Sequence, residues 1–277
     1  MSDAGWFAGL DPDDVAGAAN AIRDGRADAP ADWPARAVAA GFAPDEASYY
    51  ERLNAAAVRA ARAAAGEHER APDQQLVHAV RAMDDCARVA NELAERLAEW
   101  AGAHYGESAV GLEYARELAA REPDSPVEAR IVGLAERVAD LADERDELRA
   151  FVEREAPVVA PNLSALAGPV LSARLVALAG GLKPLARKPS GTLQVLGAED
   201  ALFAHLRGDA PSPKHGVIYT HEYVRGTAPE ERGSAARALA GKLSLAARVD
   251  YYSGERKPEL DAALEARIER IRSRVDA

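Results

Sequence analysis

Three of the chain's six histidines fall in the segment 197–223, together with Lys214, one of only five lysines. Histidines close to carboxylates are the residue types of a metal centre. The intervals of ten residues from His205 to His215 and six from His215 to His221 place no two imidazoles on one helical face. Neither interval matches the HExxH spacing of zinc enzymes. We therefore predict no metal ligand here, and interpret the segment as a surface that contacts another molecule.

Other catalytic signatures are missing from the sequence. It contains no GxSxG, no Walker loop and no GxGxxG, so we predict no catalytic residue and no cofactor. The single cysteine, Cys86, falls on an apolar helical seam, where it is interpreted as a small apolar filler. One cysteine forms no disulfide framework, which fits a reducing cytosol, and the predicted localisation is cytoplasmic.

Charge is distributed unevenly along the chain. Residues 161–277 hold 17 basic and 13 acidic side chains, a net charge of +4, whereas the whole chain carries −11. All five lysines lie in this second part. An acidic protein that keeps one basic region is expected to present that region to a polyanion. Chance together with a basic helix end is the alternative. Acids in excess of bases and Arg in excess of Lys also suggest a cytosol of high salt.

Three basic elements follow one another in this region. A Pro-punctuated loop, 182–191, carries Arg187 and Lys188, a second loop carries Lys214, and one face of a predicted long helix carries Arg237 and Arg248. Cations position phosphates, while hydroxyl and amide groups bond to phosphates or base edges. Small residues between the two arginines of the helix allow a groove or backbone to come close, although helix–helix packing uses small residues in the same way.

These residues have to be positioned by helices. Two apolar seams with alternating steps of three and four predict a pair of helices in an antiparallel coiled-coil arm, with an ordinary helical bundle as the alternative. We predict a small helical unit over 1–70, with a helix striped by Tyr49, Leu53, Ala57 and Ala61, then the arm over 71–157 and a compact helical domain over 158–277. Between the two arm helices a connection is expected, and Ser125 before Pro126 supplies a cap and a first-turn proline for the second helix. The seams consist of Leu76, Ala79, Met83, Cys86, Ala90, Leu93, Leu97 and Trp100, and of Val127, Ile131, Leu134, Val138, Leu141, Leu148 and Val152.

The compact region shows short apolar helices closed by glycines, the first of them by Gly180, then the long helix and a final amphipathic helix. The core-facing stripe of the long helix is predicted at Leu239, Leu243 and Ala246. Its segment "VIY" is expected to be extended at most. No βαβ alternation is visible, so the predicted fold class is all-α. The longest uncharged run, 156–173, contains three prolines, and no membrane span or membrane partner is predicted.

The motifs of the second half resemble the Nop domain. They are "APNLSALAGPVLSARLVALAGGLKPLARKPSGTLQVLGAEDALFAHLRG", then "PKHGVIY" and "RGSAARALAGKLSLAARVD". The Nop domain belongs to the core protein of archaeal box C/D guide ribonucleoproteins and to its nucleolar counterparts, and a spliceosomal relative shares it. The segment "DDCARVANELAERLAEWAGAHYGE" is similar to the family's coiled-coil helix, so the resemblance covers about 72–251.

The resemblance implies a scaffold without catalytic residues. In such proteins the Nop domain grips kink-turn RNA jointly with a small ribosomal-like kink-turn-binding protein. The coiled coil pairs two copies, and the N-terminal domain holds the fibrillarin methyltransferase that modifies ribose 2′-hydroxyls. The shortened residues 1–70 resemble that last domain weakly. The residues predicted to bind RNA are Arg187, Lys188, Ser190, Thr192, Gln194, Lys214, His215, Arg232, Arg237, Lys242 and Arg248.

One helix departs from the family pattern. Asp200 stands where the family usually has lysine, and Ala204 where it has arginine. The resemblance therefore does not carry RNA contacts over to the predicted helix around them. The alternative function is a coiled-coil adaptor that does not bind RNA.

Overall fold

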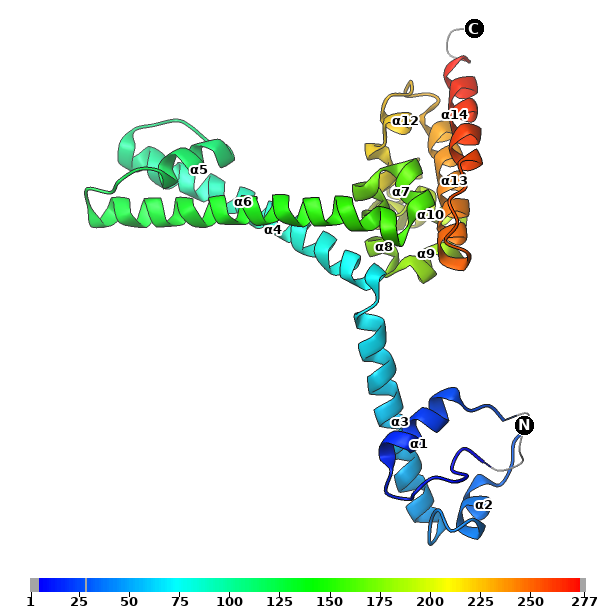
Figure 1. Cartoon of the computed structure of the whole chain (residues 1–277). Helices are drawn as coiled ribbons and strands as arrows, with labels where there is room; N and C mark the ends of the chain where they lie inside the picture. Colours follow the sequence, from blue (N-terminus) through cyan, green and yellow to red (C-terminus); the bar gives the residue numbers. More distant parts are fainter. Residues whose placement is uncertain (1–4, 28, 275–277) are drawn as a thin grey trace. The chain divides into compact units, whose positions relative to one another are not determined.

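The computed structural model describes residues 5–27 and 29–274, and within these ranges it contains helices and no β-strand. The chain divides into two compact units, Met1–Ala71 and Pro72–Ala277 (Figure 1). The all-α class predicted from the sequence is confirmed. The division of the second unit into an arm and a compact domain at 157/158 stays a prediction.

The first unit is built from α1 (Val15–Asp24), α2 (Trp33–Ala39) and α3 (Glu46–Glu69). An aspartate side chain caps the N-terminus of each helix. It accepts a hydrogen bond from the backbone N–H of the residue three positions later in the chain. A small aromatic core joins the segment that precedes α1 to α2, α3 and the loop between them. It consists of Phe7, Ala37, Phe42, Ala43 and Tyr49. The apolar stripe predicted along α3 is buried at Tyr49 but does not reach the end of the helix. No side chain of α3 after Ala56 is buried, and Ala61 is exposed.

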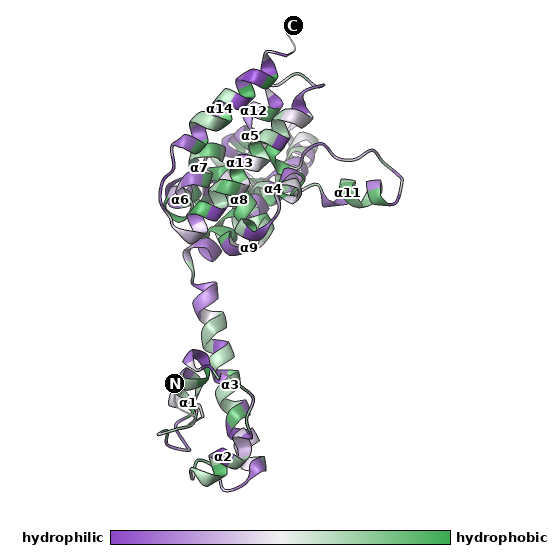
Figure 2. Ribbon diagram, turned by 90° about the vertical axis from the view of Figure 1, so that its right-hand side faces the viewer, coloured by the Kyte–Doolittle hydropathy of each residue, from purple (hydrophilic) through white to green (hydrophobic). Residues whose placement is uncertain are grey.

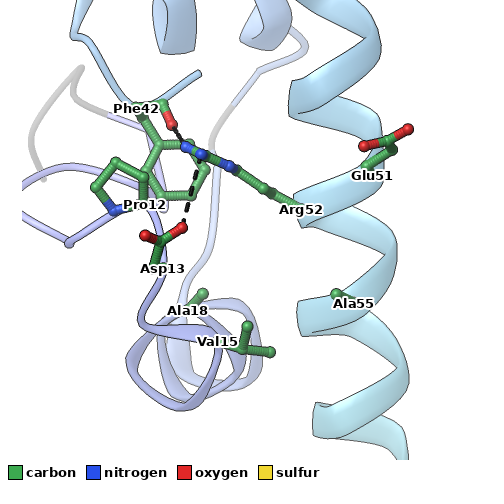
Figure 3. Close-up of a pocket in the computed structure, with 8 residues that line it drawn as sticks. All are labelled: Pro12, Asp13, Val15, Ala18, Phe42, Glu51, Arg52 and Ala55. Atoms are coloured by element: carbon green, nitrogen blue, oxygen red, sulfur yellow. Dashed lines mark hydrogen bonds and ion pairs between the residues drawn. The ribbon is translucent and has the colours of Figure 1, made fainter. Parts of the chain in front are cut away.

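A cavity of about 240 Å³ opens beside this core, between the segment leading into α1 and the first turns of α3 (Figure 3). Arg52 crosses its mouth. Its guanidinium donates to the carbonyl oxygen of Phe42 and lies 3.8 Å from the Asp13 carboxylate. The arginine therefore ties the helix to both loops that precede it.

The arm contains α4 (Pro72–Tyr105), α5 (Gly111–Ala119) and α6 (Pro126–Val159). The first turns of α4 share an apolar cluster with the end of α6, through Leu76 and Val152. The last turns of α4 share a second cluster with the start of α6, through Leu97 and Ile131. The two long helices therefore run antiparallel (Figure 1). Ser125 caps α6 by accepting the Glu128 N–H, and Pro126 follows it, as predicted.

The far end of the arm differs from the prediction. The segment expected to be a plain connection contains α5, which places Tyr114, Ala115 and Leu118 in the second cluster. This end is a three-helix bundle, and its core uses Ala94 and Ala101 of α4. Trp100, assigned to the apolar seam, is 41% exposed, and Val127 is 44% exposed. The seam prediction is wrong at these two positions because the third helix rotates the buried face.

The compact part of the second unit packs short helices around α13 (Arg232–Tyr252). Leu239, Leu243 and Ala246 form the predicted core stripe of α13 and are fully buried. The other elements of this part are α7 (Pro161–Ala167), α8 (Pro169–Ala179), α9 (Leu182–Arg187), α10 (Ser190–Gln194), the 3₁₀ helix η1 (Val217–Thr220), α12 (Glu222–Arg225) and α14 (Glu259–Arg272), together with α11 (Glu199–Leu206), which lies apart from the packed helices.

Two local predictions are wrong in this part. The segment 182–191, expected to be a loop, contains α9 and the start of α10. The "VIY" segment, expected to be extended, forms η1, which buries Ile218 completely. Pro184 falls in the first turn of α9, where proline is tolerated, whereas in "VIY" tertiary packing overrides the strand preference of β-branched and aromatic residues. Gly180 ends α8 in the left-handed conformation at φ 84°, as predicted.

A buried polar network joins α7 to the end of α13. The Asp250 carboxylate accepts the backbone N–H groups of Asn162 and Leu163, at 2.9 and 2.8 Å, and the Asn162 side-chain amide at 2.6 Å. The Asn162 oxygen in turn accepts the Lys257 N–H at 2.6 Å. Asp250 thus caps the N-terminus of α7 from a distant helix, and satisfies groups that have no other route to water.

No single helix within the described residues is long and apolar enough to cross a bilayer. The consecutive pair α7 and α8, bent by 118°, would pass such a test of length and composition.

Candidate nucleic-acid interface

The loop that presents Lys214 is fastened to α10. The Gln194 side-chain amide donates to the Lys214 carbonyl oxygen at 2.8 Å, and the Gly216 N–H donates to the Gln194 carbonyl oxygen at 2.8 Å. A Cβ atom on Gly216 would collide with the backbone carbonyl of Leu196. Only glycine allows this approach of two backbones, so the loop geometry depends on that residue.

Aromatic stacking holds the other side of the loop. The His215 ring lies against the Tyr219 ring of η1, with centroids 4.5 Å apart and planes inclined by 22°. The Arg232 guanidinium lies 5.8 Å from the centroid of the same tyrosine and donates to the Thr227 carbonyl oxygen at 3.0 Å. Burial lowers the pKa of His215 below its ordinary 6.5. A hydrogen bond with its own backbone opposes this shift, and the positive charges of Arg232 and Lys214 add to it.

The start of α13 lies beside this loop. A Cβ atom on Gly233 would stand 4.0 Å from the Cδ atom of Lys214, so the lysine stem passes over the first turn of the helix. Arg237 is exposed one turn further on, and a Cβ atom on Gly241 would meet open space. Helix packing therefore does not explain the small residues at 233 and 241. The open face of α13 is accessible between Arg237 and Lys242.

Other predicted site residues bond inside the domain. The Arg248 guanidinium donates to the Ala186 carbonyl oxygen at 3.2 Å, and the buried Ser244 hydroxyl donates to the Lys188 carbonyl oxygen at 3.4 Å. These contacts hold α9 and the following turn against α13. The structure thus gives Gln194, Arg232 and Arg248 positioning contacts. Exposed on the same elements are Arg187, Ser190, Thr192, Lys214, Arg237 and Arg248, with Lys188 and Lys242 half-buried.

The cations of this region differ from those of the arm in their partners. On the arm, many arginines pair with carboxylates, as Arg88 does with Asp85 at 2.9 Å and Arg149 with Glu153 at 2.9 Å. Within the described residues, no carboxylate forms an ion pair with the predicted cations of the interface, which are Arg187, Lys188, Lys214, Arg232, Arg237, Lys242 and Arg248. Their positive charge is therefore available to an external anion.

The three histidines that first suggested a site have separate local roles. His221 donates through Nε2 to the Leu166 carbonyl oxygen at 2.9 Å and accepts the Tyr223 N–H through Nδ1 at 3.1 Å. This bonding requires the neutral ring, and burial lowers the pKa of His221 accordingly. His205 contacts the Ala210 carbonyl oxygen at 3.0 Å. Over the part of the chain that is described, no group of three His, Cys, Asp or Glu side chains is arranged to hold a metal.

Helix α11 stands away from the packed helices on its own excursion of the chain (Figure 2). None of its residues is buried, and Phe203 and Leu206 are 57% and 70% exposed. Asp200 lies in its exposed first turn. The helix thus offers acidic and apolar side chains and adds no cation to the interface formed by α9, α10, the Lys214 loop and α13.

Sequence reasoning missed one residue that builds this interface and one that supports the surrounding domain. Tyr219 supplies the ring against which His215 and Arg232 pack, and Asp250 fixes the start of α7. The four-residue interval from His215 to Tyr219 was a usable signal. This interval brings the two rings together only in a turn or helix, whereas the sequence predicts an extended segment.

Comparisons with known proteins agree with this architecture. The family model described as "Nop: snoRNA binding domain, fibrillarin" matches residues 114–273, more than half of the chain. An uncharacterised NOP5 family protein of Methanocaldococcus jannaschii is 49% identical over 51% of this chain and 34% of its own length. Nucleolar protein 58 of Schizosaccharomyces pombe is 34% identical over 73% of this chain and 47% of its own.

A solved structure described as a fibrillarin/Nop5p complex contains a chain with the same fold. The TM-score is 0.54 at 24% identity, and the match covers 92% of both chains. The present chain spans a third to a half of the length of the curated relatives that it matches. The extent of the Nop match, together with the structural agreement, identifies the chain as a member of the Nop family.

Proposed function

We propose that this chain is an RNA-binding scaffold of a box C/D small ribonucleoprotein. In this assignment it bridges kink-turn RNA, the kink-turn-binding protein and a fibrillarin methyltransferase for guide-directed 2′-O-methylation of rRNA or tRNA. The observation that carries the proposal is the surface of exposed cations without carboxylate partners on α9, α10, the Lys214 loop and α13. Phosphates would neutralise these cations, and the Ser190 and Thr192 hydroxyls add further donors beside them.

The family assignment supports a role without chemistry of the chain's own. Nop family proteins are RNA-binding scaffolds, and the methyl transfer in this proposal belongs to the fibrillarin partner. The matched relatives are named as nucleolar proteins or a NOP5 family protein. For this chain we propose a cytoplasmic ribonucleoprotein.

Self-association through the arm completes the proposed assembly. The narrow apolar seams of α4 and α6 are used within the chain, through Leu97 and Ile131. Trp100 and Val127 remain partly exposed near the three-helix end of the arm. These apolar side chains offer a contact for a second copy.

Reconstitution tests the proposed function. Kink-turn RNA, its binding protein and fibrillarin are mixed with the chain in high salt, and complex formation and methyl transfer to a target RNA are measured. We expect little binding to RNA alone, entry into the complex once the kink-turn-binding protein is present, and methylation that requires all components. A chain that dimerises but never joins the RNA complex would establish the alternative, an adaptor without RNA binding.

A matched pair of variants links the outcome to the interface. Lys214→Gln removes a cation without a carboxylate partner, and Arg149→Gln removes one paired with Glu153 on the arm. The first should weaken complex formation and the second should not. Equal effects would show that the complex depends on total charge and not on this surface.

A further inference from the structure

The Lys214 loop gathers ionisable groups of one sign. Lys214 flanks His215 in the loop, and Arg232 from α13 shares the Tyr219 ring with it. The charged groups that act on the His215 ring, from its own loop and from α13, are Lys214 and Arg232, and both are positive. Tyr219 of η1 supplies the packed face. A proton on His215 would thus place a third positive charge in a cluster that already repels it.

The free protein therefore disfavours a proton on this ring. Partial burial and the two neighbouring cations lower the pKa of His215 below 6.5. Both causes disfavour the imidazolium, and both act in the absence of a ligand. An anion placed among the three groups reverses the electrostatic cause, because it attracts the proton that the cations repel.

We propose that His215 is a conditional cation of the interface, which takes up a proton when a phosphate of the bound RNA lies beside Lys214 and Arg232. The inference rests on the proposed function and adds its regulation by pH. His215 would add a positive charge beside the negatively charged phosphate. Tyr219 would be a positioning residue, since it fixes the imidazole by stacking and takes no part in proton transfer.

Proton uptake on binding determines the sign of the pH effect on affinity. If binding raises the pKa of His215, the complex holds one proton more than the free partners at pH values between the two pKa values. Affinity must then fall as pH rises through that window, by up to about tenfold per pH unit for a single proton. Above the bound-state pKa the affinity becomes independent of this group.

The test measures affinity for kink-turn RNA already loaded with its binding protein, from pH 5.5 to 8 at constant high salt. The proteins are the full chain, His215→Gln and His205→Gln. His205 is exposed near the end of α11 and is not part of the interface, so its variant controls for loss of a histidine. Calorimetry at one pH in two buffers of different protonation enthalpy counts the protons taken up.

The wild-type protein and His205→Gln should lose affinity as pH rises and should take up about one proton on binding. For His215→Gln the slope of log affinity against pH should be smaller by the contribution of that one proton. Tyr219→Leu should weaken binding at every pH, and Tyr219→Phe, which keeps the ring, should restore wild-type affinity. Equal slopes in wild type and His215→Gln would overturn the inference while the proposed function stood. Absence of binding at every pH would overturn the proposed function and this inference with it.

Discussion

The Gln194 side-chain amide donates a 2.8 Å hydrogen bond to the carbonyl oxygen of Lys214, and thereby joins α10 to the loop that carries the lysine. The bond lies at the surface and leaves the Lys214 ammonium group exposed. In the proposed function, Gln194 would therefore affect RNA binding through the position of Lys214. The interface is arranged before any ligand arrives, which lowers the ordering cost of binding.

Replacement of Gln194 tests this positioning role. Gln194→Ala removes one hydrogen bond worth about 1 kcal/mol, so affinity for the RNA complex should fall about fivefold. The free energy of urea unfolding should fall by no more than about 1 kcal/mol, because the same exposed bond is lost from the folded state. Gln194→Glu keeps the length of the side chain but loses the donor, and should behave like the alanine variant. Wild-type affinity in both variants would contradict the role.

Removal of the buried carboxylate should destabilise the second unit. Asp250→Ala leaves the N–H groups of Asn162 and Leu163 buried without an acceptor, at a cost of about 3 kcal/mol. Urea denaturation followed by circular dichroism measures this loss. Asp146→Ala is the matched control, because Asp146 pairs with Arg145 at the surface and should contribute less than about 0.5 kcal/mol. Similar losses in both variants would refute the capping role.

Two glycines of the interface should respond in opposite directions to alanine. Gly216→Ala drives a methyl group into the Leu196 carbonyl, and should destabilise the unit by about 1–3 kcal/mol and weaken RNA binding. Gly241→Ala adds a methyl group in open space within α13, and should stabilise by up to about 1 kcal/mol. The unfolding midpoints of the two variants check both signs. A neutral Gly216→Ala would show that the loop can shift.

The three-helix end of the arm should show a distinctive tyrosine titration. Tyr114 donates to Glu107 at 2.7 Å, and burial with this bond raises the pKa of Tyr114 to about 12. Because the folded pKa exceeds the ordinary value of 10, the stabilisation is fully present below about pH 10 and is lost as pH rises toward 12. Absorbance at alkaline pH measures the transition. Tyr114→Phe should remove the highest-pH step, and its persistence would reassign that step to another tyrosine.

The elements that the sequence predicted well are those set by local chemistry. Ser125 and Pro126 begin α6, Gly180 ends α8, and the stripe through Leu243 faces the core, as capping residues and helical periodicity indicate. Helix α5 was not predicted, because the glycines before it make its segment resemble a connection. The shared face of Tyr114 and Leu118 was the signal for a helix.

The composition of the site was predicted better than its internal bonding. Spacing places Arg248 and Ser244 on the same face of α13 as Arg237. It does not reveal that Arg248 and Ser244 donate to carbonyl oxygens of the α9 region, or that Ser244 is buried while Arg237 and Arg248 are exposed. Such contacts depend on how distant segments pack, and no interval within one helix specifies them.

The dependence of RNA affinity on salt tests the central claim most directly. Affinity for the RNA complex is measured over a series of salt concentrations for wild type, Lys214→Gln, Arg237→Gln and the arm variant Arg149→Gln. Loss of a phosphate contact should reduce the slope of log affinity against log salt by about 0.7–0.9. We predict this reduction for Lys214→Gln and Arg237→Gln, and an unchanged slope for Arg149→Gln. Identical slopes in all four proteins would contradict the assignment of this surface to RNA.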